Sequence, residues 1–76
     1  MKHEHPKAEA AWASLERIRH ALEHLKDARS LLGEAGAKKA HSAVSRALKS
    51  AHGAERHAER VYYTRYYHER REEGTA

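Results

Sequence analysis

The chain has 76 residues, no cysteine and a formal net charge of +4, which is the size of one small domain. The absence of cysteine excludes disulfides and thiolate metal ligands. Alanine is abundant, phenylalanine is absent and charged residues make up 34%, a composition typical of an all-α protein with a thin core.

Targeting and membrane segments are not indicated. No apolar run approaches the roughly 20 residues that span a bilayer. The residues after Met1 are polar, unlike the start of a signal peptide. From the chain as given, we expect a cytoplasmic protein without a membrane partner.

The first predicted helix covers about residues 6–32. It begins at Pro6, which fits the first helical turn because its missing N–H would have no partner there. The apolar residues alternate in spacing between three and four, which predicts a helix with one apolar stripe. Gly33 follows this stripe and is expected to end the helix in a left-handed conformation. The stripe comprises Ala8, Ala11, Leu15, Ile18, Leu22, Leu25, Ala28 and Leu32.

The second predicted helix covers about residues 37–73, after a turn at residues 33–36 with the sequence Gly-Glu-Ala-Gly. Its apolar stripe passes Gly53 without a change of phase, so one continuous helix is expected. This stripe comprises Ala40, Val44, Ala47, Ala51, Ala54, Ala58 and Val61.

Two such helices joined by a short turn predict an antiparallel helical hairpin, a single domain over residues 1–76. A turn at 33–36 would pair residue i with residue 69 − i, which places Trp12 opposite His57. Two helices cannot enclose five of the leucines together, so we expect a homodimeric four-helix bundle, with docking on a larger protein as the alternative. The leucines in question are Leu15, Leu22, Leu25, Leu31 and Leu48.

Eight histidines are the largest deviation in the composition. Imidazole is the commonest protein ligand for zinc, copper and nickel. His20 and His24 lie one helical turn apart, so they can hold one ion between them. His3, with the terminal amine and two amides, suits Cu(II) or Ni(II), and with His5 and His68 it could form a three-imidazole zinc site. Solvated surface histidines are the alternative interpretation.

A family resemblance supports the metal hypothesis. Residues 15–60 contain Leu-Glu-His and His-Ala steps at near-heptad spacing and a Glu-Ala-Gly turn, and they resemble small histidine-rich helical metal-binding proteins of bacteria. The resemblance implies an alanine-rich hairpin that binds divalent metal ions. The ligands that it implies are His20, His24, His41, His52 and His57.

The C-terminal part of the second predicted helix combines arginine with tyrosine. Arginine binds phosphate and tyrosine stacks on exposed bases, so this mixture indicates a nucleic-acid surface. Alternatively, Val61, Tyr62 and Tyr66 close the end of the bundle over Trp12. The candidate nucleic-acid-binding residues are Arg56, Arg60, Tyr63, Arg65, Tyr66, Tyr67, Arg70 and Arg71.

Catalytic motifs are missing from the sequence. It has no phosphate-binding glycine loop, no Ser/His/Asp set and no pair of inward-facing carboxylates, so we expect no enzymatic activity. The leading hypothesis is a non-enzymatic buffer or sensor that binds Cu, Ni or Zn. The alternatives are a nucleic-acid-binding accessory or regulatory protein and a structural adaptor in a larger assembly.

Overall fold

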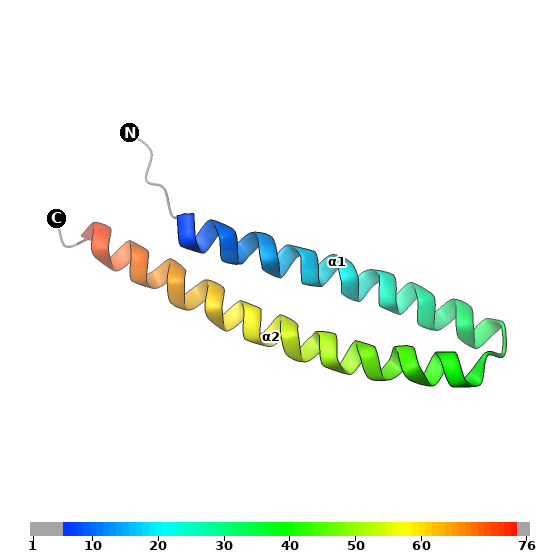
Figure 1. Ribbon diagram of the computed structural model, residues 1–76. Coiled ribbons are helices and arrows are strands. Elements are labelled where there is room, and N and C mark those ends of the chain that lie inside the picture. Colours follow the sequence, from blue (N-terminus) through cyan, green and yellow to red (C-terminus); the bar gives the residue numbers. More distant parts are fainter. Residues whose placement is uncertain (1–5, 75–76) are drawn as a thin grey trace.

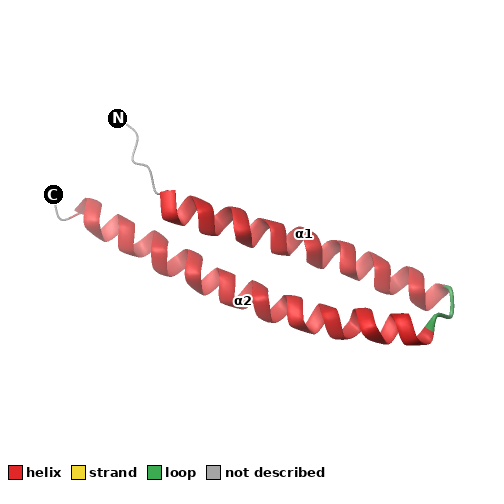
Figure 2. Cartoon of the chain, in the orientation of Figure 1, coloured by secondary structure: helices red, strands yellow, loops and turns green. Residues whose placement is uncertain are grey.

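The computed structural model describes residues 6–74, with side chains described for residues 7–69. Two helices, α1 (Pro6–Glu34) and α2 (Lys38–Gly74), run antiparallel beside each other (Figure 1). Figure 2 shows that one short loop joins them. The Cα atoms extend over 60 × 20 × 10 Å, so the molecule is a single layer of two helices. The predicted hairpin is thus confirmed.

The turn differs from the prediction because Gly36, not Gly33, adopts the left-handed conformation, with a φ of 74°. α1 continues through Gly33 to Glu34. The N–H of Ala37 donates to the carbonyl of Leu32 at 3.0 Å, and the N–H of Gly36 donates to that of Gly33 at 3.1 Å. These two bonds form a Schellman motif, which satisfies carbonyls at the end of α1.

Gly36 and Gly53 should respond in opposite ways to the same substitution. Gly36→Ala is expected to lower the free energy of unfolding by about 1 kcal/mol, because alanine is strained at a φ of 74°. Gly53→Ala is expected to raise it by about 0.5–1 kcal/mol, because Gly53 lies inside α2 and an added Cβ would meet only Arg56 Nη2, at 4.0 Å. Urea unfolding at one protein concentration measures both changes. A Gly36→Ala variant that is as stable as the unmodified chain, or more stable, would contradict the assignment of Gly36 as the turn glycine.

The two helices pair residue i with about residue 74 − i instead of 69 − i. Trp12 contacts Tyr62, and Arg19 donates a hydrogen bond to Glu55. The turn accounts for three of the five residues of this shift, because α1 ends two residues later and α2 begins one residue later than predicted. The predicted contact between Trp12 and His57 is therefore wrong.

The buried core is small. Its members on α1 all belong to the predicted stripe of that helix, which is thereby confirmed for half of its residues. The other four, Ile18, Leu25, Ala28 and Leu32, are only half-buried. Leu48 is the one buried apolar residue of α2 within the described part of the chain. The buried apolar side chains are Ala8, Ala11, Leu15, Leu22 and Leu48, with exposed fractions of 1–6%.

α2 is rotated relative to the prediction. The face that it turns toward α1 is centred on Leu48 and continues through Glu55 and Tyr62. The predicted alanine stripe lies at the margin of this face, and Ala47 and Ala54 are exposed. The rotation buries Leu48 and half-buries Tyr62 in place of alanines, and these larger side chains remove more apolar surface from water.

Candidate functional site

The line along which α1 and α2 meet has two different edges. One edge, which we call the polar edge, carries Arg19 with Glu55 and Glu59, and further along Trp12 with Tyr62. The opposite edge is lined mainly by apolar side chains, together with Ser14, His57 and Arg65. Because these edges differ in chemistry, each offers a different kind of contact.

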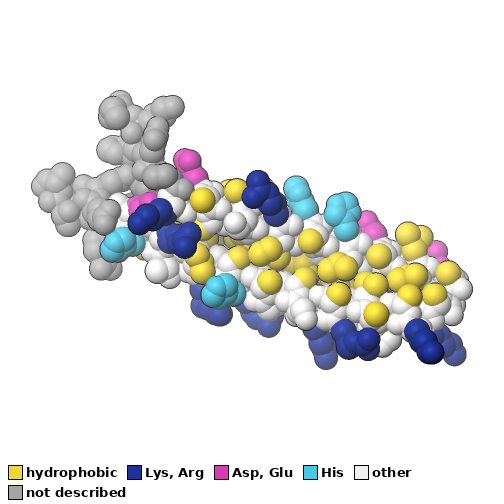
Figure 3. Space-filling view, in the orientation of Figure 1, with side chains coloured by type: hydrophobic (Ala, Val, Ile, Leu, Met, Phe, Trp, Pro, Cys, Tyr) yellow, Lys and Arg dark blue, Asp and Glu magenta, His cyan; other side chains and the backbone are white. Residues whose placement is uncertain are grey.

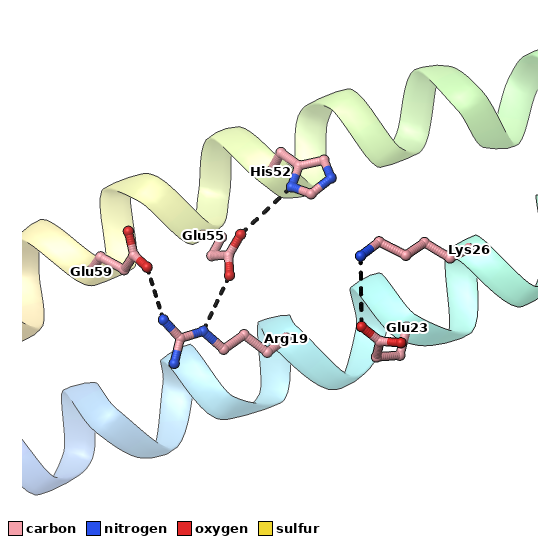
Figure 4. A network of polar contacts seen from close by, with 6 residues as sticks. All are labelled: Arg19, Glu23, Lys26, His52, Glu55 and Glu59. Atoms are coloured by element: carbon pink, nitrogen blue, oxygen red, sulfur yellow. Dashed lines mark hydrogen bonds and ion pairs between the residues drawn. The ribbon is translucent and has the colours of Figure 1, made fainter.

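Arg19 is the central residue of the polar edge, because it contacts side chains of both helices (Figure 4). Its Nε donates to Glu55 Oε2 at 3.1 Å, and its Nη2 donates to Glu59 Oε2 at 2.8 Å. Hydrogen bonds to Glu55 and then Glu59 raise the pKa of Arg19 above its ordinary value, so the guanidinium stays charged. Its Cζ lies 5.7 Å from the centroid of the Trp12 ring, within cation–π range. His52 Nδ1 lies 3.5 Å from Glu55 Oε1.

Sequence reasoning missed this network. Glu55 and Glu59 are one helical turn apart and so share a face of α2, which is a detectable signal. The incorrect register placed that face away from Arg19. With the observed register, one arginine of α1 lies opposite both carboxylates.

The aromatic side chains form one continuous cluster at the open end of the hairpin. Trp12 and Tyr62 have ring centroids 5.1 Å apart, and Tyr62 and Tyr66 5.8 Å apart. Trp12, Tyr62 and Tyr66 together line a groove of about 280 Å³. Of the alternative interpretation, the packing of Tyr62 on Trp12 is confirmed. Tyr66 packs on Tyr62, and Val61 lies on the opposite, apolar edge.

The apolar edge is continuous along the hairpin. Figure 3 shows it as a yellow band along the middle of the visible face, with dark blue side chains below it, over α2. Near the open end it forms a groove of about 400 Å³, which Ile18, Ala54 and Ala58 help to line. We call this surface the apolar strip. It comprises Ile18, Ala21, Leu25, Ala28 and Leu32 of α1 and Val44, Ala47, Ala51, Ala54, Ala58 and Val61 of α2, all exposed or half-buried.

The candidate nucleic-acid-binding residues do not form one surface. Those with exposed side chains on the outer face of α2 are Arg56, Arg60, Tyr63 and Tyr67. Tyr66 lines the same groove as Trp12, and Arg65 lines the groove of the apolar strip. The side chains of Arg70 and Arg71 lie outside the described residues.

The candidate metal ligands are spread along the hairpin. His20 and His24 are both exposed on α1. His68 lies beside Lys7 at the open end, and His3 and His5 lie outside the described residues. Within residues 7–69, no three histidine or acidic side chains come together as a metal-binding group.

The ligands that the family resemblance implied on α2 also lie apart. His41 lies against Gly33 at the turn. His52 is close to Glu55 on the polar edge, and His57 lines the groove of the apolar strip. Of the ligands implied by the resemblance, His20 and His24 are therefore the pair with metal-binding spacing on one helix.

Comparison with known proteins identifies no relative: no family model, curated protein or solved structure matches this chain. Among the described residues, neither helix has both the length and the apolar character needed to cross a bilayer.

Proposed function

We propose that the chain is a small non-enzymatic binding protein that works as a homodimer, in which two hairpins form a four-helix bundle across their apolar strips. The observation that carries this proposal is the open strip itself, whose members are alanine, valine, isoleucine and leucine, with Ser14, His57 and Arg65 also lining its groove. Three leucines and two alanines are a small core for helices of 29 and 37 residues. Covering the strip would add the missing apolar burial.

A second copy fits the strip because the strip is complementary to itself. Its larger side chains, such as Leu25 and Leu32, lie on α1, whereas α2 contributes mainly alanine, as at Ala47 and Ala51. A two-fold axis along the hairpin lays α1 of one copy on α2 of the other, so large side chains meet small ones on both sides. The hairpin is one layer thick, and a dimer gives it the second layer that helical proteins need.

Sedimentation equilibrium tests the dimer. We expect a mass of twice 8.7 kDa at micromolar concentration, with helix content and association lost together on dilution. A fully helical particle of 8.7 kDa would contradict the proposal. A helical chain found only in complex with a different protein would favour the adaptor alternative instead.

Divalent metal binding through His20 and His24 is the second candidate function. Both side chains are exposed and one turn apart on α1. In Figure 3, histidine side chains project at the upper edge over α1, away from the apolar strip. A dimer formed through the strip would leave this pair accessible, so each bundle would carry two such pairs. Two imidazoles per pair leave coordination positions open to water or a further ligand.

The metal proposal predicts a loss of affinity in one double variant. His20→Ala with His24→Ala is expected to weaken Zn(II) binding roughly tenfold, because it removes the two imidazoles that would coordinate one ion together. His52→Ala with His57→Ala is the matched control, since its two imidazoles are five residues apart and do not share a face. Titration calorimetry measures both. An unchanged affinity in the first variant, or an equal loss in the control, would contradict the His20/His24 site.

A further inference from the structure

The outer face of α2 carries a regular line of cations that ends in two tyrosines. Its positions alternate in spacing between three and four residues, so they share one side of the helix over about 42 Å. The described residues of this line are exposed, except Gly53, which has no side chain to contribute. We call this surface the basic face. It comprises Lys39, Ser42, Arg46, Lys49, Arg56, Arg60, Tyr63 and Tyr67, with Gly53 in the middle.

Acidic side chains do not neutralise the basic face. Glu55 and Glu59 point toward α1 and bond to Arg19, and Glu69 Oε2 accepts a hydrogen bond from the backbone N–H of Lys7. These three are all the acidic residues between Lys38 and Glu69. Within the side chains that the structure describes, no ion pair includes a cation of the basic face. The folding of α2 against α1 thus separates its charges, which sequence periodicity alone did not show.

Tyr63 and Tyr67 form an exposed stacked pair at the end of this line. Their ring centroids lie 6.3 Å apart with planes at 25°, and their exposed fractions are 50% and 60%. Tyr62 and Tyr66 support them edge-on from behind, at 5.0 Å and 5.5 Å, respectively. Tyr62 also packs on Trp12. The exposed rings of Tyr63 and Tyr67 are therefore part of a larger packed aromatic cluster, which restricts their movement. Such rigid exposed rings are suited to stacking with planar groups.

We propose that the basic face binds single-stranded nucleic acid, with arginine and lysine on the phosphates and unpaired bases stacked on Tyr63 and Tyr67. The combination of a cationic line and stacking rings is the one that proteins use for single strands. A duplex presents the phosphates but hides the base faces, so it can use only part of this surface. The basic face is separate from the apolar strip, so the inference goes beyond the dimer and does not depend on it.

Fluorescence anisotropy with labelled single strands of about 15 nucleotides tests this inference. We expect single-stranded RNA and DNA to bind more tightly than a duplex of the same sequence. The logarithm of the affinity should fall with the logarithm of the salt concentration by roughly 0.7 for each contacted phosphate of a single strand. Equal binding of single strand and duplex, or equal competition by anionic lipid vesicles, would overturn the proposal.

Two sets of variants distinguish the contribution of tyrosine stacking from the contribution of positive charge to the affinity for single strands. Tyr63→Ala with Tyr67→Ala is expected to lower the affinity roughly tenfold or more without changing the salt slope, and Tyr63→Phe with Tyr67→Phe should restore binding. Arg56→Gln with Arg60→Gln should reduce the slope by about 1.4. Arg17→Gln with Arg29→Gln on α1 removes the same charge elsewhere and should leave the slope unchanged. Equal effects of the two arginine pairs, or no effect of the tyrosine pair, would overturn the inference. Circular dichroism verifies that each variant remains helical.

Discussion

Replacing Leu15 with alanine is expected to lower the free energy of unfolding by about 2–5 kcal/mol. Leu15 is 1% exposed and is the largest fully buried side chain among the described residues. The substitution removes apolar contact from a core in which only Leu22 and Leu48 are other buried leucines. Because so few side chains hold the helices together, we expect much of the helical signal to be lost at temperatures where the unmodified chain is folded.

Leu31→Ala is the matched control for this prediction. It removes the same atoms from a side chain that is 64% exposed, so the expected change is within about 0.5 kcal/mol. Urea unfolding followed by circular dichroism, at one protein concentration, compares the two variants. Similar losses at Leu15 and Leu31 would mean that Leu31 is covered in solution and that Leu15 does not dominate the core.

Introducing glutamate at Ala47 is expected to raise the dissociation constant of the proposed dimer by a factor of roughly 100 or more, or about 3 kcal/mol. Ala47 is exposed in the single hairpin, so the new side chain meets no steric obstacle there. In the dimer it would be enclosed among apolar side chains, where a carboxylate lacks water and has no cation to pair with. The two-fold symmetry doubles this penalty, because each copy contributes one glutamate.

Ser30→Glu provides the control, since it adds the same charge to an exposed position of α1 that is not part of the apolar strip. Sedimentation equilibrium over a concentration series is expected to show an unchanged dimer for Ser30→Glu and a monomer for Ala47→Glu. If both variants remained dimeric with the same dissociation constant, the apolar strip would not be the dimer interface.

Much of the hairpin could be predicted from periodicity. The predicted stripe of α1 included every buried residue of that helix, Leu15 and Leu22 among them, because a spacing of three and four fixes which side chains share a helix face. The two helices and their antiparallel connection followed from the glycine-containing turn. The end of α1 was placed two residues early, since either Gly33 or Gly36 could have served as the left-handed cap by sequence alone.

The candidate sites were only partly predictable. The spacing of His20 and His24 and the mixture of arginine with tyrosine are local features, and both were recognised. Their environment was not, because it depends on how α2 is rotated about its axis. That rotation put Tyr66 in the groove that Trp12 lines, placed Arg65 on the apolar edge and left Tyr63 exposed.

By itself, the sequence determined that this protein is two amphipathic helices folded back on each other, because helix formation and apolar periodicity are local properties. Tertiary structure decided which face of α2 meets α1. Either the alanine stripe or the face with Leu48, Glu55 and Tyr62 could have packed against α1. The second face packs there, because it covers larger side chains and gives Arg19 two carboxylate partners. That choice left the alanines as an open strip and turned Glu55 and Glu59 away from the cations of the basic face, and no local pattern determines such a balance between distant residues.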